Sequence, residues 1–438
     1  MKPSARIAAS IEVLQDINSA WEIHRHTPAD ILLGKYFKQR RFMGSKDRFF
    51  VGELVYFVLR HGGALQWWLE RSKAEVKPRH LVLLALVLGY KHSLEEVNHL
   101  FTGEKYAPES LSESETTLVS DHIGLNIEKD FMPEWARYNI AEWMEAPLRA
   151  SLGDDFSAEM REAMKEAPVD LRVNTLKTSR ADVIFALDKE DILCSPTRFA
   201  PNGLRLKKRA PIMATKAFKD GWFEVQDEGS QICAALVAAQ PGEKVIDFCA
   251  GAGGKSLAIA AAMENKGRIL AWDTSDKRLN KLPKRLARAG VSTVQLRVIG
   301  SEQDAAIKRH AASADWVLVD APCSGSGTWR RNPDLKWRFT QEDLAEVIKT
   351  QAAILSSARQ LVKPGGALVY VTCSLLREEN EAQLLRFLGE NSDFRVESPD
   401  KMWDNHLSHE PYVGSVLRLT PHKDGTDGFF AAILRREQ

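Results

Sequence analysis

The first third of the chain has apolar residues at the spacing of amphipathic helices. Over residues 4–16, 46–59, 80–88 and 93–101, apolar side chains recur at i, i+3 and i+4, with few β-branched runs. These stretches predict helices, and residues 1 to about 145 therefore predict an all-α region. Residues 103–121 are rich in serine and glutamate and predict a loop.

The pattern changes after about residue 168. Residues 168–206 contain VDLRVNTLKTS and GLRLKK around a helical patch at 180–187, which predicts a small α+β unit. From about residue 217, short β-branched runs alternate with helical stretches. Strands are predicted over residues 244–248, 268–273, 294–299, 316–320 and 367–372, and helices over 255–263, 276–289 and 341–361.

Strands that alternate with helices predict βαβ units and a parallel, doubly wound sheet. The predicted fold is a Rossmann-like α/β domain over residues 217–438. It is preceded by the α+β unit over 146–216 and the helical domain over 1–145. Ligands of such a sheet bind at the carboxyl ends of its strands.

The composition excludes several classes of protein. A chain of 438 residues with 44% hydrophobic and 27% charged residues is typical of a globular protein with two or three domains. Five cysteines without regular spacing argue against a disulfide framework. The sequence contains no CxxC and no paired HxxxH, so it does not predict a metal site. No apolar run approaches the ~20 residues of a membrane span, and the first residues lack a signal-peptide core. We expect a cytoplasmic monomer.

A net charge of +1 gives no information about partners. Nucleic acid would have to bind through local basic clusters, at residues 38–41 (KQRR), at 205–209 (RLKKR) and at Arg330–Arg331. Any one cluster alone is more often a solvated face.

The stretch DFCAGAGGKS, residues 247–256, follows a predicted strand and opens a predicted helix. Its glycines can bring backbone N–H groups close to a ligand. A phosphate loop would need a glycine where Cys249 stands, and the spacing of Gly251, Gly253 and Gly254 does not fit a dinucleotide fingerprint. The remaining interpretation is a loop for S-adenosylmethionine, opened by Asp247.

A second acidic residue, Asp273, ends the next predicted strand. That position suits a carboxylate that holds ribose hydroxyls. The alternative is that Asp273 caps the helix that begins near Asp276. Together, the loop and Asp273 favour a methyl donor.

Several further segments carry a family resemblance. They are DAPCSGSGTWRRNPDLKW (320–337), KPGGALVYVTCS (363–374) followed by REEN, DGFFAAILRR (427–436), DLRVNTLKTS (170–179) and WFEVQDEGSQ (222–231). With DFCAGAGGKS, these segments resemble the Sun/RsmB family of RNA cytosine-5 methyltransferases. Residues 45–60, SKDRFFVGELVYFVLR, resemble more weakly the NusB-like, RNA-binding domain of the bacterial members.

The resemblance implies S-adenosylmethionine as the cofactor and RNA as the partner. Two positions depart from the family pattern: Ala252 replaces the usual proline, which predicts a more mobile loop, and residues 299–302 offer no clear acidic contact for the adenine. The residues expected to bind the cofactor are Cys249, Ala250, Gly251, Ala252, Gly253, Gly254, Lys255, Asp273 and Asp320.

Two cysteines, Cys323 and Cys373, end predicted strands, and a serine expected to cap a helix follows Cys373. Cytosine C5 is too weak a nucleophile to take a methyl group unaided, but a thiolate that adds to C6 activates it. The residues alone leave open which thiol attacks, and packing or a disulfide are the alternatives. The other three cysteines, Cys194, Cys233 and Cys249, fit simple packing.

In the resembled RNA enzymes the TCS cysteine attacks, which implies Cys373 as the nucleophile and Cys323 as the residue that assists product release. Asp320 is placed to hydrogen-bond the N3/N4 edge of the base. Lys255 either orients Asp320 or the substrate, or is a surface residue of its helix. Candidates for stacking and phosphate contacts are Trp329, Arg330 and Arg331. For Trp329, core packing is the alternative.

The sequence therefore predicts an S-adenosylmethionine-dependent RNA cytosine-C5 methyltransferase that forms a covalent adduct between a cysteine and C6. The resemblance implies small-subunit (16S) ribosomal RNA as the substrate, with transfer RNA as the alternative. A rival from another class is a non-catalytic RNA-binding or assembly factor. That rival predicts loss of a catalytic thiol or of the donor loop, and the sequence has both.

Overall fold

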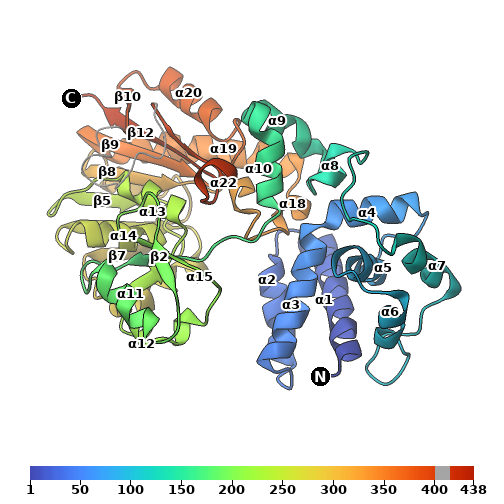
Figure 1. The fold of residues 1–438 in the computed structure, drawn as a ribbon. Coiled ribbons are helices and arrows are strands. Elements are labelled where there is room, and N and C mark those ends of the chain that lie inside the picture. Colours follow the sequence, from blue (N-terminus) through green and yellow to red (C-terminus); the bar gives the residue numbers. More distant parts are fainter. Residues whose placement is uncertain (400–414) are drawn as a thin grey trace. The chain divides into compact units, whose positions relative to one another are not determined.

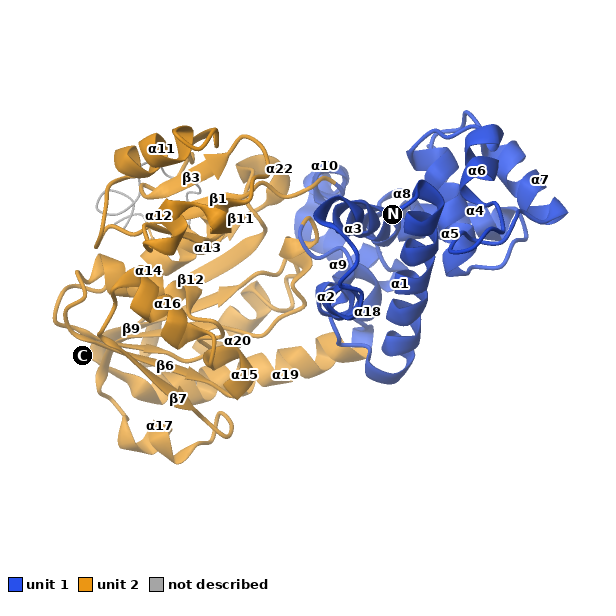
Figure 2. Cartoon of the chain, turned by 90° about the horizontal axis from the view of Figure 1, so that it is seen from below, with its two compact units in different colours: residues 1–164, 331–341 blue, residues 165–330, 342–438 orange. Residues whose placement is uncertain are grey.

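The structure is a computed structural model that describes residues 1–399 and 415–438. The chain forms two compact units (Figure 2). Residues 1–164 with 331–341 form the first, here called the helical unit, and residues 165–330 with 342–438 form the second, the sheet unit. Within the described ranges, no helix is long and apolar enough to cross a membrane.

The helical unit is a group of helices (Figure 1). Most of these helices contribute buried side chains to one apolar core. The sequence predicted four of these helices, and all four are confirmed. The helices are α1 (Pro3–His24), α2 (Ala29–Gln39), α3 (Ser45–Arg60), α4 (Gly62–Arg71), α5 (Pro78–Leu84), α6 (Leu94–Leu100), α7 (Glu113–His122), α8 (Glu134–Arg137), α9 (Glu145–Leu152) and α10 (Phe156–Ala163).

The predicted loop over residues 103–121 is wrong in its second half, where α7 begins. The Ser112 hydroxyl accepts a hydrogen bond from the Glu115 N–H, and the Glu115 carboxylate accepts one from the Ser112 N–H. This capping box satisfies donors that a helix start leaves unpaired. Leu118 and Val119 are buried in the core, so tertiary packing stabilises a helix whose exposed face is polar.

Residues 331–341 fold as part of the helical unit, although they follow the DAPCSGSG motif in the sequence. They contain the short helix α18 (Leu335–Arg338). The indole N–H of Trp337 donates to the Leu59 carbonyl at 2.6 Å, and the Asp334 carboxylate accepts from the Ala29 N–H at 3.2 Å. The NPDLKW part of that motif is therefore anchored in the core of the helical unit.

The sheet unit begins with a small antiparallel sheet in the order β2-β3-β1-β4. The predicted α+β character of this segment is confirmed. Its last strand lies beyond the predicted boundary at residue 216, and the division into three domains stays a prediction. The elements are β1 (Asp170–Val173), α11 (Arg180–Asp188), β2 (Cys194–Pro196), β3 (Gly203–Leu206), α12 (Lys216–Lys219) and β4 (Phe223–Val225).

The large sheet has the order β10-β12-β9-β8-β5-β6-β7, and β11 pairs with β12. Strands β9, β8, β5, β6 and β7 are parallel, and β12 and β10 extend the sheet in antiparallel orientation. All five predicted strands are confirmed. The strands are β5 (Lys244–Asp247), β6 (Arg268–Asp273), β7 (Val294–Val298), β8 (Ala314–Asp320), β9 (Val362–Thr372), β10 (Phe394–Glu397), β11 (Leu417–Leu419) and β12 (Phe429–Arg436).

Successive strand residues point to opposite faces of this sheet, and helices cover both faces. Val245 packs on the face covered by α13 (Glu228–Ala235), α14 (Gly254–Ala262) and α16 (Leu282–Ala289). Its neighbour Ile246 packs on the face covered by α17 (Ala305–Arg309), α19 (Gln341–Ala358) and α20 (Glu381–Glu390).

The predicted helix over residues 276–289 is divided into α15 (Asp276–Leu279) and α16. Pro283 lies in the first turn of α16. Proline has no N–H to donate and is tolerated only at a helix start, so the chain begins a new helix there.

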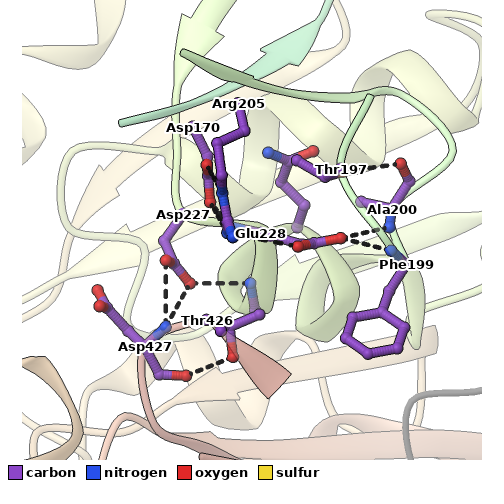
Figure 3. A network of polar contacts seen from close by, with 12 residues as sticks. Asp170, Thr197, Phe199, Ala200, Arg205, Asp227, Glu228, Thr426 and Asp427 are labelled. Atoms are coloured by element: carbon purple, nitrogen blue, oxygen red, sulfur yellow. Dashed lines mark hydrogen bonds and ion pairs between the residues drawn. The ribbon is translucent and has the colours of Figure 1, made fainter. Parts of the chain in front are cut away.

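A polar network joins the small sheet to helix α13, which packs on the large sheet (Figure 3). Asp170 on β1 forms two hydrogen bonds with the Arg205 guanidinium on β3, at 2.7 and 2.8 Å, and accepts one from the Glu228 N–H at the start of α13. The Glu228 carboxylate in turn accepts from the backbone N–H groups of Phe199 and Ala200. Arg205, part of the basic cluster at 205–209, therefore serves this network.

Candidate active site

Three aspartates and a cysteine mark the carboxyl ends of four neighbouring parallel strands. Asp247 ends β5, Asp273 ends β6, Asp320 ends β8, and Cys373 directly follows β9. Because these strands are parallel neighbours, their carboxyl ends meet at one edge of the sheet. The structure thus brings the predicted donor loop and both predicted catalytic segments to this edge.

The glycine loop between β5 and α14 adopts a conformation that requires glycine. Gly251 and Gly253 have φ angles of 55° and 76°, in the left-handed region that other residues rarely adopt. A Cβ atom on Gly253 would lie 2.3 Å from a Leu282 methyl group, whereas one on Gly251 would meet open space. Gly251 therefore lies at an open edge of the loop, where its backbone can approach a ligand.

Two arginines that the sequence reasoning missed hold this loop. Arg285 on α16 donates to the Ala252 carbonyl at 2.5 Å, and Arg172 on β1 donates to the Gly254 carbonyl at 2.7 Å. Arg285 also pairs with Glu224 on β4 at 3.0 Å. The small sheet therefore supports the loop at the position where alanine replaces proline. No local sequence pattern predicts these contacts, because both arginines are distant from the loop in sequence.

Asp273 is 3% exposed and holds the same loop from β6. One carboxylate oxygen accepts from the Gly251 N–H at 2.8 Å and the other from the Ser275 N–H at 2.7 Å. The cap of helix α15 is Ser275, whose hydroxyl accepts from the Arg278 N–H. Asp273 thus links the donor loop to the β6–α15 turn, and its contact with ribose stays a prediction.

Asp247 supplies an acceptor beneath the loop. It is 1% exposed, and the Ser256 hydroxyl donates to one of its oxygens at 2.5 Å. The other oxygen has no hydrogen-bond partner among the described residues. Burial raises the pKa of Asp247 to about 7. Unpaired buried acceptors are rare, so a donor on a ligand is a natural partner.

These residues fit S-adenosylmethionine, which carries an ammonium group and two ribose hydroxyls. The loop offers backbone N–H groups, Asp247 an unpaired carboxylate oxygen, and Asp273 a second carboxylate at the next strand end. The cofactor would supply a positively charged sulfonium with a transferable methyl group.

Lys255 and Asp320 form an ion pair at the centre of the sheet edge. The Lys255 Nζ lies 2.6 Å from an Asp320 carboxylate oxygen. The lysine side chain is 9% exposed, whereas that of Asp320 is 35% exposed. Burial opposes the ammonium charge, but the Asp320 carboxylate and the nearby thiols raise the pKa of Lys255 above its ordinary value. Lys255 is therefore no surface residue; it orients Asp320, whose other face is open.

The two cysteines meet in the loops that follow β8 and β9. Their Sγ atoms lie 3.4 Å apart, and both are free thiols. The Gly327 N–H donates to the Cys373 carbonyl at 2.9 Å, which joins the two loops through their backbones. The hydrogen bond that the Cys323 thiol makes to Cys373, together with burial, raises the pKa of Cys323 well above its ordinary value.

Glu379, in the REEN segment, binds both cysteine loops from below. It is fully buried, and its carboxylate accepts from the N–H and the hydroxyl of Ser324 at 2.8 and 2.5 Å and from the Ser374 hydroxyl. Gln351 on α19 donates to it at 3.0 Å. Ser324 follows Cys323 and Ser374 follows Cys373, so one carboxylate fixes the two thiols relative to each other. Nothing in the REEN motif alone predicts this role for Glu379.

Two sequence interpretations near this site are corrected. Ser374 does not cap α20, because Asn380 precedes that helix and the Ser374 hydroxyl accepts from the Leu376 N–H instead. Trp329 is 1% exposed and Arg330 3% exposed, and Arg330 donates to the backbone carbonyls of Gly425 and Thr426. Core packing therefore explains Trp329, and Arg330 braces the segment before β12 and presents no open face to RNA.

Of the remaining cysteines, Cys233 is completely buried on α13 and fits the predicted packing role. Cys194 and Cys249 are half-buried, at the edge of separate apolar clusters. Burial raises the pKa of Cys249. The pair described above remains the reactive candidate because its two thiols contact each other at the carboxyl ends of neighbouring strands.

A family model described as 16S rRNA methyltransferase RsmB/F matches residues 234–435, and one described as Methyltr_RsmF/B-like, ferredoxin-like domain matches residues 140–213. The probable ribosomal RNA small subunit methyltransferase B of Synechocystis sp. is 32% identical over 99% of both chains. Ribosomal RNA small subunit methyltransferase B of Citrobacter koseri is 34% identical over 70% of this chain and 68% of the relative.

Two solved structures resemble the chain closely in fold. The crystal structure of PH0851 has a TM-score of 0.80 at 26% identity and covers 100% of this chain and 99% of that one. A methyltransferase homolog protein from Pyrococcus horikoshii has a TM-score of 0.59 at 30% identity, over 69% of this chain and 97% of the other.

Proposed function

Because the chain belongs to the 16S rRNA methyltransferase RsmB/F family, we propose that it methylates C5 of a cytosine in small-subunit ribosomal RNA. The family membership confirms the predicted resemblance, the fold class and an S-adenosylmethionine-dependent RNA methyltransferase. The choice of C5 and the roles of individual residues are the proposal. We also propose that it acts in the cytoplasm.

The observation that carries the proposal is the pair of thiols 3.4 Å apart beside an oriented carboxylate. We assign Cys373 as the nucleophile. Its thiolate adds to C6 of the cytosine, and the electron pair of the C5–C6 double bond makes C5 nucleophilic toward the methyl group. Asp320, held by Lys255, hydrogen-bonds the N3/N4 edge and stabilises charge that builds on the ring.

The second half of the reaction needs a different group. After methyl transfer, C5 must lose its proton to a base such as water, and the pair from that C–H bond reforms the C5–C6 double bond as the Cys373 thiolate leaves. Cys323 lies beside the departing sulfur, and we assign it to this release step. Glu379 and its serine partners hold both thiols in place through the two steps.

The substrate must present an unpaired or extruded cytosine, because C5 and C6 are stacked inside a duplex. The relatives named ribosomal RNA small subunit methyltransferase B support 16S rRNA as that substrate, and transfer RNA is the alternative. We propose that the helical region and the small α+β unit supply RNA contacts outside the cytosine pocket.

Methylation of defined RNAs by the purified full-length chain tests this function. We expect label from methyl-tritiated S-adenosylmethionine to enter in vitro transcribed 16S rRNA, and bisulfite sequencing to find it at one cytosine. Incorporation into transfer RNA but not into 16S rRNA would select the alternative substrate. No incorporation into either RNA would contradict the function.

A further inference from the structure

The helical unit contains a cavity of about 900 Å³ that no part of the proposed reaction uses. It lies between the first turns of α1, the end of α2 with the turn that follows it, and the loop between α6 and α7. Six of its lining side chains are cationic or aromatic: Lys2, Tyr36, Arg40, Phe42, Lys105 and Tyr106. Its size is in the range of pockets that hold a small ligand or a nucleotide.

Two aromatic side chains stand open at this cavity. Phe42 is 74% exposed and Tyr106 is 72% exposed. The Tyr106 ring has a cation beside it, since the Lys105 Nζ lies 5.1 Å from the ring centroid. The Tyr106 ring therefore offers a flat face next to positive charge.

Tyr106 has a φ angle of 71°, in the left-handed region that costs an ordinary residue about 1 kcal/mol. Two backbone hydrogen bonds hold this turn, from the Gly103 N–H to the Pro108 carbonyl and from the Ala107 N–H to the Glu104 carbonyl, both at 2.9 Å. Strain of this kind concentrates at binding sites.

The charge around the cavity is positive. Arg40 lies 3.7 Å from the Tyr36 ring centroid and pairs with the carboxylate of Glu12, the one acidic residue of the lining. From residue 35 to 48 there are six lysines and arginines and one acidic residue, Asp47, which is buried and paired with Arg6. The basic cluster at 38–41 thus borders a cavity with open aromatic faces.

We propose that this cavity binds an unpaired nucleotide of the RNA substrate, with the base against Phe42 or Tyr106 and the phosphates near Lys2, Arg40 and Lys105. Aromatic faces interleaved with basic side chains are the features by which proteins bind single-stranded nucleic acid. The inference rests on the proposed RNA substrate and deepens it, because it names a second RNA contact on the helical unit. An acidic protein partner is the competing occupant, and the test separates the two.

The test measures RNA binding by the full-length protein with two probes, a fluorescein-labelled oligouridylate and in vitro transcribed 16S rRNA. Base stacking is worth ~1–3 kcal/mol per base, so Phe42→Ala and Tyr106→Gly should each weaken oligouridylate binding by about 10-fold. Lys105→Ala should lower the salt dependence of binding by about one ion. Phe131→Ala removes an equally exposed ring outside the cavity and is the matched control, with unchanged affinity.

Tyr106→Gly also separates a binding role from a structural one. Glycine relieves the left-handed strain, so the variant should keep or raise its Tm while it loses RNA affinity. The three cavity variants, Phe42→Ala, Tyr106→Gly and Lys105→Ala, should keep the affinity for S-adenosylmethionine and the kcat at saturating 16S rRNA, with a raised KM for the RNA.

The proposal is overturned if Phe42→Ala combined with Tyr106→Gly binds both probes as tightly as the wild type. It is also overturned if the wild type binds neither probe; either result leaves a protein as the occupant. Failure of the methylation assay is a separate outcome, because binding is measured without methyl transfer.

Discussion

The sulfur atoms of Cys323 and Cys373 lie 3.4 Å apart, in the loops that follow adjacent parallel strands. At this distance a proton on one sulfur can be shared with the other, and two thiolates would repel each other. Burial and the hydrogen bond to Cys373 raise the pKa of Cys323, so Cys323 keeps the proton. The arrangement therefore favours one thiolate at a time, as a mechanism with separate attack and release steps requires.

The ion pair between Lys255 and Asp320 gives the first prediction. Lys255→Met keeps the length of the side chain but leaves Asp320 without its partner, so the carboxylate loses the orientation that it needs toward the base. We expect kcat to fall by ~100-fold or more, with RNA affinity little changed. The kcat of Asp320→Asn should fall by a similar factor. Steady-state methyl incorporation and RNA binding measure the two quantities.

The matched control is Lys284→Ala, which removes an exposed lysine of α16. It should leave kcat unchanged. A Lys255→Met variant with wild-type kcat would show that Lys255 has no part in orienting Asp320 for catalysis.

The ends of the strands could be predicted from the sequence, and the supports of the loops could not. Asp247, Asp273 and Asp320 each close a short, largely apolar run, so alternation with helices was enough to bring them to one edge. Glu379 and Arg285 act through contacts made only after the chain has folded. Periodicity describes a single element and carries no information about such distant partners.

Polar segments were the other source of error. The helix α7 was predicted as a loop because its composition is polar, although Ser112 and Glu115 already formed a capping-box signature. Trp329 and Arg330 resembled RNA contacts because basic and aromatic residues favour binding surfaces, but burial decides between surface and core, and only the fold gives it. The return of residues 331–341 to the helical unit likewise has no local signal.

Glu379 gives a second prediction, on the geometry of the thiols. Glu379→Ala leaves buried donors of Ser324 and Gln351 without their acceptor, which should lower the free energy of unfolding by about 3 kcal/mol. Glu379→Gln keeps one acceptor oxygen and should lose about half of that or less. Urea denaturation measures both, with Arg377→Ala, an exposed neighbour, as the control.

The same variants test whether Glu379 positions the sulfurs. Diamide takes two electrons and two protons from a close thiol pair and leaves a disulfide. We expect rapid formation of a Cys323–Cys373 disulfide in the wild type and in Arg377→Ala, and slow formation in Glu379→Ala, followed by mass spectrometry. Equal rates in all three proteins would show that Glu379 stabilises the fold without positioning the thiols.

Asp247 gives a prediction on pH. Burial raises its pKa to about 7, whereas an aspartate in an unfolded chain titrates near ~3.9. Between these values the folded protein binds a proton that the unfolded chain releases, so this group makes stability fall as pH rises from about 4 to 7. The amide side chain in Asp247→Asn cannot ionise, so this variant does not lose stability in this way as the pH rises.

The variant should therefore gain stability relative to the wild type as pH rises through that window, with no further gain above it. Urea denaturation at several pH values measures the difference, and Asp276→Asn, at an exposed aspartate, is the control. A difference that is constant with pH would mean that Asp247 is ionised throughout. Because Asp247 faces the donor site, we also expect weaker binding of S-adenosylmethionine by Asp247→Asn.

Asp273 gives a prediction on the methyl donor. Asp273→Ala removes both the predicted ribose contact and the hydrogen bond that holds Gly251. A charge-assisted hydrogen bond is worth ~1.5–3 kcal/mol, so the affinity for S-adenosylmethionine should fall by ~10-fold or more. Calorimetry on the full-length protein measures this, and Cys373→Ser, which leaves the donor loop intact, should bind normally. Unchanged affinity of Asp273→Ala would remove it from the site.

The most direct test of the account compares the two cysteine variants in one assay. Each is incubated with 16S rRNA and methyl-tritiated S-adenosylmethionine, then separated by denaturing electrophoresis. Cys373→Ser has no thiol to add to C6, and an alcohol with its far higher pKa cannot replace it, so we predict neither methylated RNA nor a covalent complex. Cys323→Ser should attack and methylate but fail to release, so a protein–RNA adduct that carries the tritium label should accumulate. An adduct formed by Cys373→Ser instead would exchange the two roles, and full activity of both variants would contradict a catalytic function for either thiol.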